Sequence, residues 1–333
     1  MVHYTVSEDD AGLRLDQWCK KHCPFIPFGA LHKLIRKGAI KVDNKKTDAS
    51  TRLVAHQQIY CSDALLAEQP ASLPPSAPSL SLAKKKETLG WIIKTYPHAF
   101  VLNKPAGIAA QGGTGLNDSV DARLDALKGE NDVRPKLVHR IDKDTSGVMI
   151  IARTRLAAAE LTEAFRAKTT RKRYWALVVG VPDHPIGSIN LPLGKRDVHQ
   201  KEKMRVVIDE HTGQEALTHY RVVESWHGLV SWLELFPVTG RTHQLRVHLE
   251  HIGHPIVGDG KYGGAFAFPT FAQNDVVLAK QLHLHARSIN IKSPLGNIHA
   301  TAPLPEHMQH SWESCGFAPD DHGVSLWELY DVL

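Results

Sequence analysis

Hydrophobic and polar residues follow two different periods along the chain, and near its start they predict a small domain. Four apolar residues recur there at helical spacing: Leu13, Leu15, Trp18 and Cys19. A second helix is predicted over about residues 29–37, ending at Gly38 because glycine readily adopts the left-handed conformation of a helix cap. Ile40-Lys41-Val42 then alternates as a strand does, and Asp43-Asn44 is typical of a turn.

A second and longer periodic region mixes strands and helices. The strands are predicted over residues 99–102, 148–152, 174–179 and 230–236. Two helices are predicted, one over about residues 155–168 with Thr154 as its N-cap, and one from Thr242 to Gly253. Strands and helices do not alternate regularly, so we predict an α+β fold with a mixed, mainly antiparallel sheet rather than a doubly wound one.

The two regions are separated by a segment that has no hydrophobic period. Residues 69–83 are rich in Pro, Ser and Ala, a composition typical of a semi-extended linker that cannot pack. We therefore expect a small α+β N-terminal domain of residues 1–66, a linker of residues 67–86, a large domain of residues 87–305 and an acidic tail of residues 306–333.

Charge is unevenly distributed over the 333 residues. The 41 residues after Lys292 contain six carboxylates and no Lys or Arg, so the overall net charge of +5 corresponds to +11 for residues 1–292. A basic body of this kind suits a polyanion such as RNA, although an ordinary solvated surface explains the charge almost as well.

The sequence also predicts a compartment. No apolar run approaches the roughly 20 residues that a membrane helix needs, and the N-terminus lacks the basic and apolar regions of a signal peptide. The four cysteines, Cys19, Cys23, Cys61 and Cys315, are too few and too scattered for a disulfide framework. We expect a cytoplasmic protein without membrane contact.

The densest polar segment of the chain, residues 139–147, lies between two apolar stretches. It reads His139-Arg140-Ile141-Asp142-Lys143-Asp144-Thr145-Ser146-Gly147. A polar loop between buried strands presents side chains rigidly, although most such loops are ordinary salt-bridged turns.

This segment resembles the His-Arg-Leu-Asp-x-x-Thr-Ser-Gly motif of the RluA family of pseudouridine synthases, with Ile141 as a conservative departure. Four further segments resemble family elements in the expected order: residues 103–107 (Asn-Lys-Pro-Ala-Gly), 173–178 (Arg-Tyr-Trp-Ala-Leu-Val), 239–248 (Thr-Gly-Arg-Thr-His-Gln-Leu-Arg-Val-His), and 253–259 with Tyr262-Gly263. Five ordered elements are far more specific than any one of them.

The resemblance implies conversion of uridine to pseudouridine in RNA and a role for each matching residue. Asp142 is the implied nucleophile, which attacks either the uracil ring or the ribose C1′. Tyr174 stacks on the base, and Arg246 pairs with Asp142 and keeps it ionised. Arg140 fills the space that the flipped nucleotide leaves. The other implied substrate-binding residues are Leu245, Arg241 and Lys104.

Without the resemblance these residues have ordinary explanations. Tyr174 on an apolar strand would be a core aromatic residue, and Arg246 on a helix would be a surface charge. Leu245 would belong to the core in either case. The functional interpretation therefore depends on the ordered set of motifs rather than on single residues.

The N-terminal region resembles the S4 RNA-binding module in two segments, residues 13–16 (Leu-Arg-Leu-Asp) and 34–43. The resemblance implies RNA binding by the basic second helix and the strand after it, through Lys33, Arg36, Lys37 and Lys41. Residues 111–116 and Met204-Arg205-Val206 further resemble a subgroup of the family that acts on large-subunit ribosomal RNA.

Other functions are less well supported. The clustered histidines lack the His-Glu-x-x-His spacing of a zinc enzyme, and the glycine-rich residues 111–116 lack the Lys-Ser/Thr of a phosphate-binding loop. We expect a monomeric enzyme without metal or cofactor, acting on ribosomal RNA. Two alternatives stay open: the same chemistry on transfer RNA, and a non-catalytic RNA-binding factor in ribosome assembly.

Overall fold

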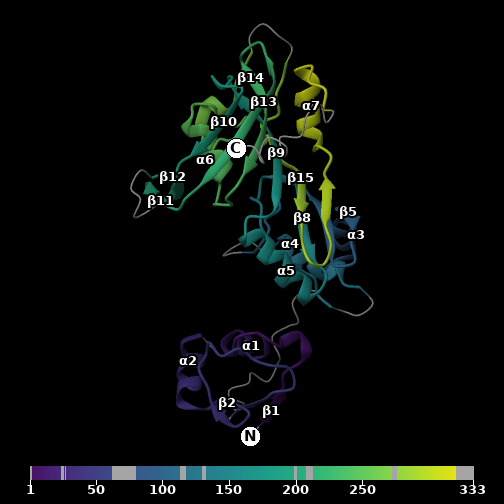
Figure 1. The fold of residues 1–333 in the computed structure, drawn as a ribbon, viewed down its shortest axis with the longest axis vertical. Helices are drawn as coiled ribbons and strands as arrows, with labels where there is room; N and C mark the ends of the chain where they lie inside the picture. Colours follow the sequence, from purple (N-terminus) through teal and green to yellow (C-terminus); the bar gives the residue numbers. More distant parts are fainter. Residues whose placement is uncertain are drawn as a thin grey trace. The chain divides into compact units, whose positions relative to one another are not determined.

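The structure is a computed structural model that describes residues 2–23, 26, 28–61, 80–112, 118–129, 133–198, 201–207, 213–271 and 276–319. It divides into two compact units, residues 1–79 and 80–333 (Figure 1). Most of the expected linker, part of the glycine-rich segment and the last residues of the expected tail lie outside the described residues. Within the described part of the chain, no helix has the length and apolarity needed to cross a membrane.

The N-terminal unit packs two helices on an antiparallel sheet. The helices are α1 (Leu15–His22) and α2 (Phe28–Lys37), and the sheet order is β1 (Val2–Thr5), β4 (Gln58–Cys61), β2 (Ile40–Val42) and β3 (Lys45–Lys46). Gly38 ends α2 with φ 75°, and left-handed Asp43 and Asn44 form the β2–β3 turn. The predicted helices, strand and turn are thus confirmed. Their apolar side chains, including Trp18, form one buried core.

The large unit is built on a twisted ten-stranded sheet with the path β10-β13-β14-β9-β15-β8-β6-β5. In addition, β16 pairs with β15 and β7 pairs with β8. The strands are β5 (Ile92–Thr95), β6 (Ala99–Lys104), β7 (Lys136–Leu137), β8 (Ser146–Ala152), β9 (Arg171–Val179), β10 (Ile186–Asn190), β13 (Leu217–Trp226), β14 (Val230–Pro237), β15 (Leu284–Ile291) and β16 (Ile298–Thr301). Strands β11 (Leu193–Val198) and β12 (Lys201–Val206) form a separate hairpin.

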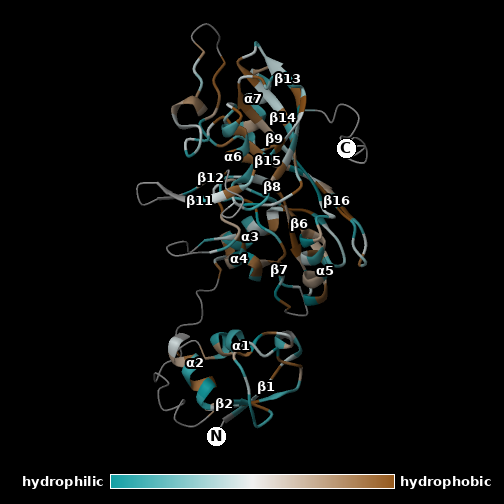
Figure 2. Cartoon of the chain, turned by 60° about the vertical axis from the view of Figure 1, so that its left-hand side comes forward, coloured by the Kyte–Doolittle hydropathy of each residue, from teal (hydrophilic) through white to brown (hydrophobic). Residues whose placement is uncertain are grey.

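Within this sheet β15 and β8 run parallel, and the other described pairs are antiparallel. The predicted mixed, mainly antiparallel α+β fold is therefore confirmed. Hydrophobic residues are concentrated along β14, β9 and β15, and hydrophilic residues are prominent on α1 and α2 of the N-terminal unit (Figure 2).

Helices cover the large sheet and its edges. They are α3 (Leu82–Gly90), α4 (Val120–Arg123), α5 (Arg155–Arg166), α6 (Gln244–His251) and α7 (Glu306–Ser314), together with short 3-10 turns. As predicted, Thr154 caps α5, since its side chain accepts a hydrogen bond from the backbone N–H of Ala157 at 3.1 Å. Helix α6 begins at Gln244 rather than Thr242, because His243 takes the left-handed conformation with φ 55°.

Two expected boundaries differ from the structure. Helix α3 begins at Leu82, inside the range assigned to the linker, because the Ser81 side chain caps its first turn. The segment from Glu306, expected to be a tail, starts with α7, whose buried Met308 and Trp312 join a core cluster with Trp232 of β14. Hydrophobic burial on one helix face outweighs the acidic composition of this segment.

The parallel contact between β8 and β15 fixes the end of the loop that contains residues 139–145. Gly147 has φ 109°, and a Cβ atom there would clash with the Ala286 backbone, so the close approach requires glycine. Next to it, the buried Ser146 hydroxyl lies 2.8 Å from Nδ1 of His285. These contacts anchor the polar loop to β15.

Candidate active site

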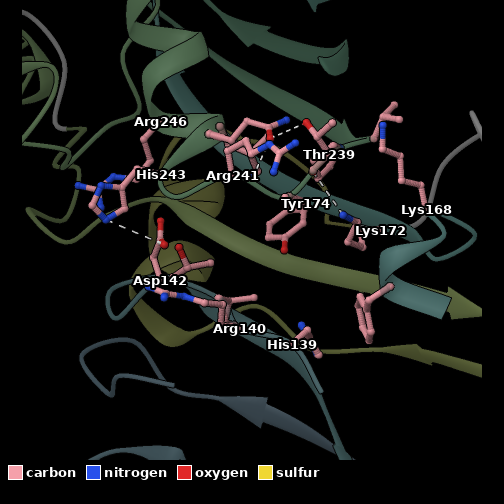
Figure 3. A pocket seen from close by; sticks show the side chains of 18 of the residues that line it. His139, Arg140, Asp142, Lys168, Lys172, Tyr174, Thr239, Arg241, His243 and Arg246 are labelled. Atoms are coloured by element: carbon pink, nitrogen blue, oxygen red, sulfur yellow. Dashed lines mark hydrogen bonds and ion pairs between the residues drawn. The ribbon is translucent and has the colours of Figure 1, made fainter. Parts of the chain in front are cut away.

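One pocket of the large unit, with a volume of about 560 Å³, contains most of the predicted functional residues. It is enclosed by the loop before β8, the first residues of β9, the segment after β14 and the start of α6. Its lining includes Arg140, Asp142, Tyr174, Arg241, Leu245 and Arg246 (Figure 3). The fold thus brings together residues that are about 100 positions apart in the sequence.

Asp142 lies in a tight turn at the wall of this pocket. Its backbone carbonyl accepts a hydrogen bond from the N–H of Thr145 at 3.2 Å, and its carboxylate is 18% exposed. The Nε2 atom of His243 lies 4.0 Å from its Oδ1 atom, as Figure 3 shows. A partly exposed carboxylate on a fixed turn is accessible to a ligand and held in place.

Tyr174 and Lys172 extend from β9 into the same pocket (Figure 3). Residues two apart on a strand point to the same face, which explains why the two side chains lie together. Burial, with a contribution from the charge of Asp142, raises the pKa of Tyr174 above its ordinary value, so the phenol keeps its proton. Burial lowers the pKa of Lys172 to about 8.

Arg246 does not make the pairing expected from the sequence. Its guanidinium binds Asp259 through two hydrogen bonds of 2.7 Å, so the predicted ion pair with Asp142 is wrong. Burial alone would lower the pKa of Arg246, but the hydrogen-bonded Asp259, together with the more distant charge of Asp142, raises it. A bidentate carboxylate satisfies a planar guanidinium better than a single distant one.

Lys104 is also placed differently from its expected role in substrate binding. It is fully buried, and its ammonium group donates hydrogen bonds to the carbonyls of Pro105, Ile108 and Lys143 at 2.8, 2.8 and 3.0 Å. Burial lowers the pKa of this lysine to about 7, although Asp144 and Asp142 act in the opposite direction. Lys104 therefore ties two loops together and does not line the pocket.

The remaining predicted residues line the pocket in different ways. Leu245 is buried and packs in one core cluster with Tyr174, whereas Arg140 is exposed at the pocket wall. The Nε atom of Arg241 donates to the Glu215 carbonyl at 3.0 Å, which holds its guanidinium at the rim.

The sequence analysis assigned no role to two pocket residues: His243, which lies within the motif of residues 239–248, and Lys172, which directly precedes the motif of residues 173–178. His243 contacts the Tyr262 hydroxyl through Nδ1 at 2.6 Å, and burial lowers its pKa although Asp142 raises it. Burial also raises the pKa of Tyr262 to about 12, so the phenol keeps its proton. Because Nε2 faces the Asp142 carboxylate, we place the imidazole proton on Nε2 and assign the phenol as donor to Nδ1. Side chains two residues apart on a strand point to the same face, so the predicted position of Tyr174 in the site could have identified Lys172 as a neighbour.

The N-terminal unit contains a basic groove of its own. It is lined by His32, Ile35 and Arg36 of α2 and by residues 45–49 and Thr51, which include Lys45 and Lys46. Of the four residues predicted to bind RNA, Arg36 lines this groove, and Lys33, Lys37 and Lys41 lie outside its lining.

Comparisons with known proteins indicate a family for the chain. Residues 98–251 match a sequence family described as RNA pseudouridylate synthase. The chain is 34% identical over 306 residues to "Ribosomal large subunit pseudouridine synthase C" of Vibrio vulnificus, covering 91% of this chain and 93% of that protein. It is 36% identical over 280 residues to the protein of the same name from Rickettsia conorii, covering 83% and 88%.

Solved structures of pseudouridylate synthase domains also resemble the chain. "Human RNA Pseudouridylate Synthase Domain Containing 4" superposes with a TM-score of 0.58 at 27% identity, covering 71% of this chain and 98% of that one. "Human RNA Pseudouridylate Synthase Domain Containing 1" superposes with a TM-score of 0.55 at 25% identity, covering 78% and 97%. The similarity therefore extends over nearly the whole length of both solved chains.

Proposed function

The chain belongs to the RNA pseudouridylate synthase family, and from this premise we propose that it isomerises specific uridines of large-subunit ribosomal RNA, with Asp142 as the nucleophile. Membership makes the protein an isomerase that forms pseudouridine. The observation that carries the residue assignment is the position of Asp142, whose carboxylate shares one pocket with Tyr174, Leu245 and Arg246.

The reaction exchanges one bond for another without net loss of atoms. The bond between N1 and C1′ breaks, a bond between C5 and C1′ forms, C5 loses a proton and N1 gains one. An ionised carboxylate can start this sequence by attacking C6 of the uracil or C1′ of the ribose. The volume of the pocket is in the range that encloses small ligands, so it suits a single base flipped out of the RNA.

The pocket residues take separate roles in this proposal. Tyr174 presents a neutral phenol ring for stacking on the flipped base, and Leu245 forms an apolar wall. Arg140 is exposed beside the nucleophile and fills the gap in the RNA. Arg246 is engaged by Asp259, so it acts on Asp142 through its positive potential rather than by a direct pair.

Two observations support ribosomal RNA as the substrate. Curated relatives that are about one third identical over most of the chain carry the name "Ribosomal large subunit pseudouridine synthase C". The N-terminal unit adds a basic groove containing Arg36, Lys45 and Lys46, which suits the phosphate backbone of a structured RNA. We propose that this unit is an S4-like RNA-binding module.

The decisive experiment measures tritium release from C5-labelled uridine in a large-subunit ribosomal RNA transcript. Wild type should release label, and Asp142→Asn should lose turnover by about 10⁴-fold or more while RNA affinity stays nearly constant. Asp144→Asn is a matched control, because this exposed carboxylate lies two residues away and outside the pocket lining. Tritium release from transfer RNA but not from ribosomal RNA would indicate transfer RNA as the substrate. No tritium release from either RNA would favour a non-catalytic RNA-binding factor.

A further inference from the structure

Lys172 places a partly buried amine in the active-site pocket without a matching anion. Its Nζ atom lies 3.4 Å from the carbonyl oxygen of Thr239, which is near the limit of a hydrogen bond (Figure 3). In the described part of the chain, no carboxylate lies within ion-pair distance of this amine. An ammonium group in such a setting loses hydration and gains little in return.

The groups around Lys172 do not compensate for this loss. The imidazole of His139 accepts a hydrogen bond from the Ile150 N–H through Nε2 at 2.8 Å, and it stacks on Phe165 with ring centroids 4.3 Å apart. Burial, with a smaller contribution from the charge of Lys172, lowers the pKa of His139 to about 3. His139 is therefore neutral and cannot serve as a counter-ion.

Two carboxylates at the pocket are directed to other groups. Glu215 lies 3.6 Å from the ammonium of Lys168, which is an exposed residue at the pocket rim. Asp142 faces His243. A Met or Leu at position 172 would fill the same space without the cost of burying an amine, so the lysine indicates an interaction that forms only when a ligand is bound.

The proposed reaction supplies the negative charge that the free protein lacks. If the bond between N1 and C1′ breaks first, its electron pair stays on the uracil and spreads over N1, O2 and O4. If the Asp142 carboxylate adds to C6, the electron pair of the C5–C6 double bond moves into an enolate at O4. Both routes put negative charge on the carbonyl oxygens of a base that is stacked beside Tyr174, next to Lys172 on the same strand face.

We propose that Lys172 is a catalytic residue that donates a hydrogen bond from its ammonium group to a carbonyl oxygen of the flipped uracil and stabilises the negative charge that develops on the base. This proposal rests on the pseudouridine synthase activity proposed above. Fixed donors aimed at developing charge in a partly dehydrated site lower the transition state more than the ground state. The loss of Lys172 should therefore slow the reaction more than it weakens RNA binding.

The test compares single-turnover rates of wild type, Lys172→Met, Lys172→Arg and Lys292→Met on the same ribosomal RNA transcript. We expect Lys172→Met to lose about 10²- to 10³-fold in rate, which is typical of removing one donor to an oxyanion. Lys172→Arg keeps the charge and should recover part of the rate. Lys292→Met removes the same charge from an exposed site outside the pocket lining and should react at the wild-type rate.

A second substrate separates charge stabilisation from positioning. The same transcript is made with 5-fluorouridine, whose fluorine withdraws electrons and stabilises a negative charge on the base without help from the protein. Consumption of 5-fluorouridine is followed in nuclease-digested RNA. Lys172→Met should lose less rate with this RNA than with uridine, because the fluorine supplies part of the missing stabilisation.

Each result decides between the explanations. An unchanged single-turnover rate with weaker RNA binding would overturn the proposal and make Lys172 a phosphate contact. Equal losses with both RNAs would also overturn it, in favour of a positioning role. Thermal unfolding of the variants, with Lys172→Arg as the more conservative change, identifies losses that come from misfolding. An inactive wild-type protein would instead contradict the proposed function and the role of Lys172 with it.

Discussion

The Nε2 atom of His243 lies 4.0 Å from the Oδ1 atom of Asp142. The other ring nitrogen contacts the Tyr262 hydroxyl at 2.6 Å, and the His243 backbone is held in the left-handed conformation at the start of α6. A chain of three side chains therefore ends at the proposed nucleophile. This arrangement turns Nε2 of His243 toward a carboxylate whose expected arginine partner is engaged by Asp259.

Tyr262→Phe should lower the single-turnover rate about 10-fold, because it removes a hydrogen bond that fixes the proton on Nε2 of His243 and is worth about 1.4 kcal/mol. The matched control is Tyr96→Phe, which removes a 2.7 Å hydrogen bond to the His299 carbonyl outside the pocket. The control should lose stability without losing rate. Equal rates for wild type and Tyr262→Phe would show that the chain of side chains has no role in catalysis.

Lys104→Met should destabilise the large unit, because three backbone carbonyl groups lose the one buried donor that they share. Each unsatisfied buried polar group costs about 1–3 kcal/mol, so the denaturation midpoint and the activity should fall together. Lys143→Met serves as a control, because the Lys143 side chain is exposed and only the backbone carbonyl of this residue binds Lys104. The substitution therefore leaves that hydrogen bond in place. A stable but inactive Lys104→Met variant would restore the role in substrate binding that the sequence predicted.

The basic groove of the N-terminal unit makes a prediction about salt dependence. Replacing Arg36, Lys45 and Lys46 together by Ala should weaken binding to ribosomal RNA and reduce the slope of log K against log salt by up to about 2–3. The comparison is a triple Ala variant of Lys33, Lys37 and Lys41, which lie outside the groove lining. If the second triple variant lost more affinity, the RNA would follow the surface predicted from the sequence instead of the groove.

The stability of the protein should fall as the pH drops from about 6.5 toward 4. His283 and His285 are fully buried, and burial lowers their pKa values to about 4 and about 3. Below pH 6.5 the unfolded chain takes up protons on these rings and the folded protein does not, so each contributes a loss of about 1.4 kcal/mol per pH unit. Urea denaturation at pH 7.5 and 5.5 measures this loss, and constant stability over that interval would contradict it.

The sequence predicted which residues share the pocket, and the elements around them, because these depend on local patterns. The ordered motifs placed Asp142, Tyr174 and Leu245 in one site, and the fold unites them in one pocket. Helical spacing, the cap at Gly38 and the alternation of Ile40-Lys41-Val42 likewise depend on neighbours in the chain. The structure confirms these helices, the cap and the strand because each is determined by residues close together in the sequence.

Pairings between distant residues could not be obtained in the same way. The sequence analysis paired Arg246 with Asp142, and only the fold shows that Asp259 meets its guanidinium in a bidentate geometry. Lys104 looks the same in sequence whether it contacts a substrate or three buried carbonyls. The left-handed conformation of His243, which delays the start of α6, likewise depends on its contact with Tyr262 and the segment before it.

The order of strands in the large sheet has a consequence for the way the enzyme is made. Strand β15 lies between β9, which carries Tyr174, and β8, which follows the Asp142 loop, yet it is synthesised long after both. Until residues 284–291 leave the ribosome, the two halves of the sheet have no strand to join them. The nascent chain therefore acquires its reactive pocket only after β15 has been synthesised.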